Sequence, residues 1–142
     1  MRREIRFRGK RKGSNEWIYG YIREIWASKD DGRRFVICPS NCYENDGCTD
    51  LEGVEIIPET IGQFTGVKGE KGKDIYEGDI VKAYVERKTF VSSVKWGVKS
   101  NGWSLYCTVL SHKWDKPKYY KLPASHNIEV IGNVHDNPEL LK

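Results

Sequence analysis

Apolar and polar residues alternate with a period of two along much of this 142-residue chain. In residues 79–85, for example, Val81, Ala83 and Val85 fall on one side. Successive side chains of a β-strand point to opposite faces, so this pattern predicts strands with one buried face. No segment of about ten residues keeps a helical period. The segments that we predict to be strands are 4–8, 16–26, 33–38, 53–58, 63–67, 74–76, 79–85, 90–96, 103–110 and 128–134.

These strands predict a mainly β fold in which short antiparallel strands form a small barrel or sandwich, with an SH3-like barrel as one option. The length suits a single domain, 1–142, with an N-terminal β lobe of about 1–60 and a barrel-like lobe of about 61–142. Only the C-terminus indicates a helical turn. There Asn137 can cap the turn, Pro138 occupies its first position, and Glu139 lies near its positive end.

Residues 61–81, IGQFTGVKGEKGKDIYEGDIV, are rich in glycine and allow three interpretations. A phosphate-binding P-loop requires Ser or Thr after Gly-Lys and then a helix, but Asp74 follows Gly72-Lys73 and a strand comes next. Three glycine triplets without proline do not sustain a collagen helix. The segment is therefore predicted to be a hairpin, with Gly72 in a left-handed conformation at its turn.

A second tight turn is predicted at Gly78-Asp79, where an acidic side chain usually accepts hydrogen bonds from nearby backbone amides. Glu77 and Asp79 flank one glycine, so on a strand both could point to the same side, as a catalytic carboxylate pair would require. The turn role explains them more simply. The histidines His112, His126 and His135 are scattered and have no motif around them. We therefore predict no catalytic residues and no enzymatic activity.

Three segments together resemble the YopX family of bacteriophage and prophage proteins. They are REIRFRGKRKGSNEWIYGYI (3–22), GQFTGVKGEKGKDIYEGDIV (62–81) and EVIGNVHDNPELL (129–141). One departure is Lys71-Gly72, where family members commonly have Asn-Gly, which leaves the turn type open. The resemblance implies a β-rich, barrel-containing protein of phage origin without assigned catalytic residues.

The positions that match the central family motif are predicted to be turn-forming and core residues rather than a binding site. They are Gln63, Phe64, Thr65, Gly66, Gly72, Ile75, Tyr76, Gly78 and Asp79.

Charge is distributed unevenly, although the net charge is only +4. Residues 1–12 carry seven basic side chains and one acid, whereas residues 35–67 carry six acids and no Lys or Arg. Arg3, Arg6 and Arg8 are candidate binding residues at the basic end. Because apolar and polar residues alternate in residues 4–8, we interpret these arginines mainly as the solvated face of a sheet, and only secondarily as a binding patch.

A second candidate surface interleaves lysines with aromatic residues in residues 112–121. Small β-barrels bind nucleic-acid strands through such combinations, but aromatic residues also build cores and lysines also protect edge strands. The candidate binding residues here are Lys113, Trp114, Lys116, Lys118, Tyr119, Tyr120 and Lys121.

The four cysteines, Cys38, Cys42, Cys48 and Cys107, are predicted to be free thiols. Their spacings differ from the close pairs of zinc sites, so we expect no metal and no cofactor. Neither a signal peptide nor a run of about 18 apolar residues is present, which predicts a cytoplasmic protein of the bacterial host with no membrane partner.

The residues predict a protein that works by binding, and the resemblance to the YopX family implies an accessory protein of phage or prophage origin. A protein partner, including a second copy of the chain, is favoured. Nucleic-acid binding by a β-barrel is the alternative.

Overall fold

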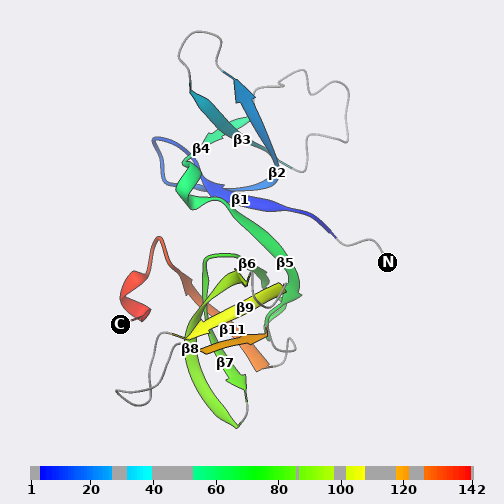
Figure 1. The fold of residues 1–142 in the computed structure, drawn as a ribbon. Helices are drawn as coiled ribbons and strands as arrows, with labels where there is room; N and C mark the ends of the chain where they lie inside the picture. Colours follow the sequence, from blue (N-terminus) through cyan, green and yellow to red (C-terminus); the bar gives the residue numbers. More distant parts are fainter. Residues whose placement is uncertain are drawn as a thin grey trace. The chain divides into compact units, whose positions relative to one another are not determined.

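The computed structural model describes residues 4–26, 32–39, 53–85, 87–97, 102–107, 118–121 and 127–141. Within these residues the chain is almost entirely β, as predicted, and its strands form two antiparallel sheets (Figure 1). One sheet has the order β4-β3-β2-β1-β5-β6 and the other β10-β9-β8-β7-β11, so the described strands do not make a closed barrel. The chain divides into two compact units, Met1–Phe64 and Thr65–Lys142.

The first unit is built on an antiparallel meander of four strands. They are β1 (Phe7–Lys10), β2 (Trp17–Trp26), β3 (Arg33–Pro39) and β4 (Val54–Ile56). Asn15 has a φ of 58° in the turn between β1 and β2, a conformation that asparagine tolerates well. A short 3-10 helix, η2 (Pro58–Thr60), follows β4 and was not predicted.

The core of the first unit lies on the face that carries Gly9, Ile37 and Ile56, all of them buried. Glycine is required at position 9 because a Cβ atom there would lie 2.1 Å from Ile56 Cγ2 and 3.5 Å from Ile37 Cδ1. The absence of a side chain on β1 therefore lets the β4 isoleucine fill the core.

The start of β1 differs from the prediction in two ways. Ile5 precedes the strand and is 53% exposed, so it does not share a buried face with Phe7. Arg8 is only 6% exposed, so the arginines of this segment do not form a simple solvated face. The neighbours that cover Arg8 come from β2, and the sequence alone does not place them.

The second unit is built around β7 (Asp79–Val85), β8 (Lys88–Gly97), β9 (Gly102–Cys107), β10 (Lys118–Lys121) and β11 (Ile128–Asn133). Its buried cluster contains Ile75, Val81, Ala83, Val94 and Ile128. The alternation read from the sequence correctly puts Val81 and Ala83 on the buried face.

Several details of this sheet depart from simple alternation; for example, Ile80 and Val81 are neighbours in β7 and both are buried. Trp96 shares the face of Val94 but is half-exposed, and it packs edge-to-face on Trp103, with ring centroids 4.9 Å apart. The register between β11 and β7 shifts between Val130 and Gly132, which marks a β-bulge.

The glycine-rich segment is a hairpin, as predicted, with β5 (Gly62–Lys68) and β6 (Asp74–Tyr76) as its arms. Gly72 has a φ of 73°, its N–H donates to the Gly69 carbonyl (2.9 Å), and the Gly69 N–H donates to the Lys73 carbonyl (2.8 Å). This is the pattern of a three-residue loop with a bulge glycine. Lys71 is not among the positive-φ residues of the described chain, so lysine is compatible with the position before the glycine.

The C-terminal helical turn is confirmed as η4 (Pro138–Leu141), a 3-10 helix that begins with proline. The side chain of Asn137 accepts a hydrogen bond from the Asn133 N–H (3.3 Å), so it binds back to the end of β11.

Candidate functional site

Cations and aromatic rings share one face of the sheet in the first unit. β1 and β2 pair in antiparallel register, with Lys10 opposite Trp17 and Arg8 opposite Tyr19. Directly opposed residues of paired strands lie on the same face, and every second residue of a strand returns to it. We call this surface the aromatic–cation face. Its residues are Arg6, Arg8, Lys10, Trp17, Tyr19, Tyr21 and Arg23.

The cations of the aromatic–cation face lie over its rings. The guanidinium carbon of Arg8 is 4.6 Å from the ring centroid of Trp17, and Lys10 Nζ is 5.5 Å from the same ring. Both distances fall within the range of a cation–π interaction. The Trp17 ring therefore has two cations of β1 within the distance of a cation–π interaction.

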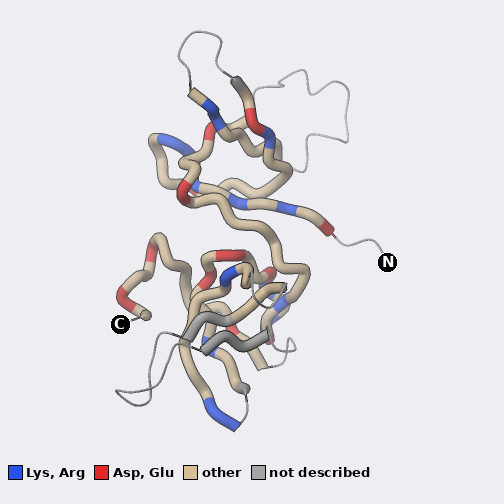
Figure 2. The backbone as a smooth tube through the Cα atoms, in the orientation of Figure 1, with Lys and Arg blue, Asp and Glu red and all other residues tan. Residues whose placement is uncertain are grey.

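Arg6 extends this arrangement toward β5. Its guanidinium carbon lies 4.9 Å from the ring centroid of Phe64, and the Phe64 N–H donates to the Arg6 carbonyl (2.8 Å). The side chain of Arg6 is 23% exposed, so part of it faces solvent. Figure 2 shows the basic residues that follow one another along β1.

Two tyrosines provide the exposed ring surface of the aromatic–cation face. Tyr19 and Tyr21 are each 46% exposed, and they follow one another on the same side of β2. Two residues of an extended strand span about 6.8 Å, which sets the approximate spacing of the two rings along the strand. Tyr19 and Tyr21 therefore present part of their rings to solvent on this face.

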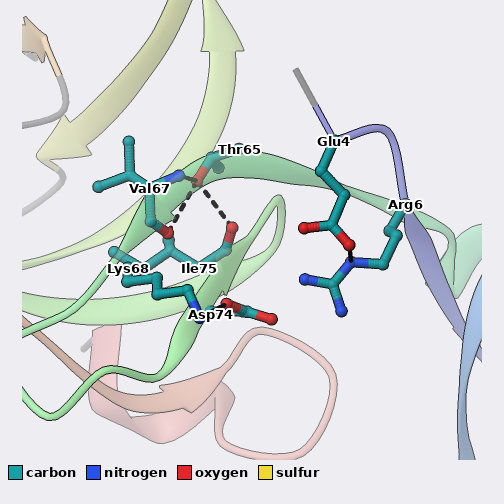
Figure 3. A network of polar contacts seen from close by, with 7 residues as sticks. All are labelled: Glu4, Arg6, Thr65, Val67, Lys68, Asp74 and Ile75. Carbon is teal, nitrogen blue, oxygen red and sulfur yellow. Dashed lines mark hydrogen bonds and ion pairs between the residues drawn. The ribbon is translucent and has the colours of Figure 1, made fainter. Parts of the chain in front are cut away.

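The ion pairs among the described residues of this unit include one on β2 and β3, where Arg33 Nε lies 3.2 Å from Glu24 Oε1. Glu4 Oε1 is 2.9 Å from Arg6 Nε (Figure 3), and Glu55 Oε1 is 3.1 Å from Lys12 Nζ. Lys12 and Glu4 are both well exposed, so water and salt screen these pairs.

Several binding residues named from the sequence lie outside the described residues, namely Arg3, Lys113, Trp114 and Lys116. Residues 118–121 form β10, which pairs with β9, but only the backbone of Lys118, Tyr119, Tyr120 and Lys121 is described. Arg6 and Arg8 are candidate residues from the sequence, whereas Trp17, Tyr19 and Tyr21 join the candidate surface only through the pairing of β1 with β2. The signal that was available is the recurrence of aromatic residues at every second position of 17–21.

The residues of the central motif make contacts that hold the fold together. The Thr65 hydroxyl donates to the Ile75 carbonyl (2.7 Å) and accepts from the Val67 N–H (3.1 Å), which ties β5 to β6 (Figure 3). Lys68 Nζ lies 3.5 Å from Asp74 Oδ1 on the same pair of strands. Gln63 pairs with Phe7, while Gly66 has a φ of 84° just after Thr65.

The second turn of the motif, at Gly78-Asp79, also links neighbouring parts of the second unit. Gly78 has a φ of 87°, its N–H donates to the Val94 carbonyl (3.0 Å), and its carbonyl accepts from the Val134 N–H (2.9 Å). Asp79 is 2% exposed, and its carboxylate accepts from the Tyr76 N–H (2.8 Å). This is the turn role that the sequence predicted for the acid, and it places Asp79 away from solvent.

In the ranges that the structure describes, no three His, Cys, Asp or Glu side chains are grouped as metal ligands. Cys38 is a free thiol; Cys42 and Cys48 lie outside these ranges, and the Cys107 side chain is not described. Among the same residues, no helix has the length and apolar character that crossing a membrane requires.

Of the histidines named from the sequence, His135 is exposed, and its backbone N–H donates to Asn133 Oδ1 (3.0 Å). His112 and His126 are outside the described ranges.

Comparison with known proteins gives a family and a fold. A family model described as YopX protein matches residues 6–142. A solved structure, protein EF1440 from Enterococcus faecalis, is similar at a TM-score of 0.50 and 16% identity, with 98% of this chain and 99% of that chain covered. At this identity the likeness concerns the fold alone. A search of curated proteins found no match.

Proposed function

This chain belongs to the YopX protein family, and we propose that it is a non-enzymatic binding protein whose contact surface is the aromatic–cation face. The observation that carries the proposal is the pair of half-exposed rings, Tyr19 and Tyr21, beside the basic residues of β1. Tyrosine, tryptophan and arginine are the residue types that most often dominate binding energy at interfaces.

The proposal of binding rather than catalysis draws on the central motif. Its one candidate carboxylate pair includes Asp79, which is buried and accepts a backbone hydrogen bond. A carboxylate engaged in this way is poorly placed to exchange protons with a substrate.

The partner expected from the sequence is a protein or a second copy of the chain, with nucleic acid as the alternative. We place the protein in the cytoplasm of a bacterial host, as a phage or prophage product. We propose that any of these three partners would bind at the aromatic–cation face. The contacts between its cations and rings hold the side chains in place before binding, which reduces the entropy lost on association.

Site-specific photo-crosslinking in host cells tests the proposed surface. A benzophenone amino acid replaces Tyr19 in one variant and Tyr84 in a control. Tyr84 is a tyrosine of β7 with a similar exposure of 49%. We expect irradiation to give covalent adducts, to protein or to nucleic acid, in clear excess at position 19. Equal yields at the two positions, or no adduct at position 19, would exclude the aromatic–cation face as the contact surface.

A further inference from the structure

We infer that the outer edge of β11 is a pairing surface for a second copy of this chain, and that the tip of the glycine-rich hairpin covers it. The tip is residues 69–73, which join β5 to β6. The inference concerns the second unit and goes beyond the function proposed for the aromatic–cation face. It depends on the contacts between the tip and β11.

β11 is an edge strand. It stands last in the order of the described strands of its sheet, so one of its sides pairs with β7 and the other faces outward (Figure 1). The strand carries the β-branched residues Ile128, Val130 and Ile131, and Ile131 is 36% exposed. Because an edge offers backbone N–H and C=O groups to another chain, an apolar, β-branched edge is a template for pairing.

The tip of the hairpin lies against the backbone of β11. The Glu70 N–H donates to the Ile128 carbonyl (2.8 Å). A Cβ atom on Gly69 would lie 3.1 Å from the same carbonyl oxygen and 3.9 Å from the Val130 nitrogen, so glycine lets the two backbones approach closely. The tip therefore takes the place at Ile128 that a strand of another chain would occupy.

An ion pair adds to this cover. Lys71 Nζ lies 3.3 Å from Glu129 Oε1, and the lysine side chain is 79% exposed. An exposed pair of this kind is weakened by water and salt. A backbone hydrogen bond and an exposed ion pair can open while the buried cluster of the second unit stays folded.

The other end of β11 is protected as well. Asn137 Oδ1 accepts from the Asn133 N–H (3.3 Å) and would lie 2.6 Å from a Cβ atom on Gly132. The β-bulge between Val130 and Gly132 interrupts the strand before that point. Covering segments and bulges are protections that natural proteins give to their edge strands. The part that the tip guards is therefore the stretch from Ile128 to the bulge.

A second copy of the chain fits this stretch. Alternate residues of a strand direct their backbone groups to the same side, so those of Val130 point the same way as the Ile128 carbonyl. Displacing the tip would free both residues for pairing. The same edge is present on every copy, and antiparallel pairing of identical strands around a two-fold axis closes into a dimer.

Replacing Glu70 by Pro tests the cover, because proline has no N–H to donate. The Gly72 N–H donates to the Gly69 carbonyl (2.9 Å), which makes position 70 the second residue of a four-residue turn, a place that proline favours. Glu70→Ala removes the same side chain but keeps the N–H, so it is the matched control. In sedimentation velocity over a concentration series, Glu70→Pro should raise the self-association constant about tenfold, whereas Glu70→Ala should leave it within about twofold.

Three further variants locate the contact. Ile131→Lys, added to Glu70→Pro, puts a charge on the edge and should return self-association to the level of the unaltered protein. Lys71→Glu places a like charge beside Glu129 and should promote self-association at low salt. Lys73→Glu makes the same change of charge at another exposed position of the tip and should not promote it.

Equal self-association of Glu70→Pro and Glu70→Ala would overturn the inference, as would self-association that Ile131→Lys leaves unchanged. A cooperative thermal transition shows that Glu70→Pro is folded. If it is not folded, Lys71→Glu decides the question, and self-association equal to that of Lys73→Glu would exclude the cover. Association through the aromatic–cation face would be common to all these variants, and crosslinking at position 19 tests it separately.

Discussion

The carboxylate of Asp79 accepts a hydrogen bond from the backbone N–H of Tyr76, with Oδ2 and N separated by 2.8 Å. Both residues are buried, so water cannot replace this bond. The side chain thus closes the turn around Gly78, which is itself bonded to Val94 and Val134. The carboxylate of Asp79 thus helps to hold the turn between β6 and β7.

Replacing Asp79 by Ala should lower the free energy of unfolding by about 1–3 kcal/mol, because the Tyr76 N–H would be left buried without its acceptor. Urea denaturation measures the change. Asp79→Asn keeps an acceptor oxygen at the same position, so it should cost less than Asp79→Ala. Equal losses for the two variants would mean that the charge of Asp79, rather than this hydrogen bond, stabilises the turn.

Thr65 links the two arms of the central hairpin through its hydroxyl, which donates to Ile75 and accepts from Val67. Thr65→Val has nearly the same shape but no hydroxyl, and it should destabilise the protein by about 1–2 kcal/mol. Thr65→Ser retains the hydroxyl and serves as the matched variant. If chemical denaturation shows that the serine variant loses more stability than the valine variant, packing of the methyl group rather than hydrogen bonding explains Thr65.

Gly9 leaves room for the side chain of Ile56. Gly9→Ala should reduce stability by about 1–3 kcal/mol, because the new Cβ atom would overlap Ile56 Cγ2 at 2.1 Å in a packed core. A double-mutant cycle with Ile56→Ala checks the cause. In the background of Ile56→Ala the cost of Gly9→Ala should fall markedly, since the overlapping atom is gone. Strictly additive effects would place the cost of alanine elsewhere.

Arg87 has a φ of 65° in the connection between β7 and β8, a conformation that glycine adopts with less strain. We therefore expect Arg87→Gly to raise the thermal unfolding midpoint, with a gain of up to about 1 kcal/mol in the free energy of unfolding.

Gly72→Ala is the converse test. Gly72 also has a positive φ, 73°, and no atom lies within 4 Å of the position that a Cβ would take. Backbone strain alone should therefore lower the thermal unfolding midpoint of this variant and reduce its free energy of unfolding by about 1 kcal/mol.

For Arg87→Gly, a midpoint below that of the unaltered protein would contradict the prediction. It would show that the arginine side chain makes contacts that stabilise the protein by more than its backbone strain costs.

Much of the second unit could be predicted from the sequence. Val81 and Ala83 are buried where alternation puts them, and Gly72 adopts the left-handed conformation that its hairpin requires. These features depend on residues that are close together in the sequence. The steric and solvation preferences of such residues can be inferred from the residue types alone.

The candidate site could be predicted only in part. Arg6 and Arg8 were identified by their charge, but the rings that they contact belong to β2 and β5. A strand's own sequence does not reveal which residues of another strand will lie opposite, because the register depends on the turn and on the packing of both faces.

The β class, the central hairpin with its glycine turn, the terminal helical turn and the family resemblance could all be read from the sequence. The burial of Arg8 beside Trp17, the exposure of Ile5 and the position of Tyr19 and Tyr21 beside the cations of β1 became known only from the folded chain. The difference lies in the range of the interactions. Turn geometry and alternation are set by local sterics, whereas a buried cation exists only after a second strand has brought a ring over it.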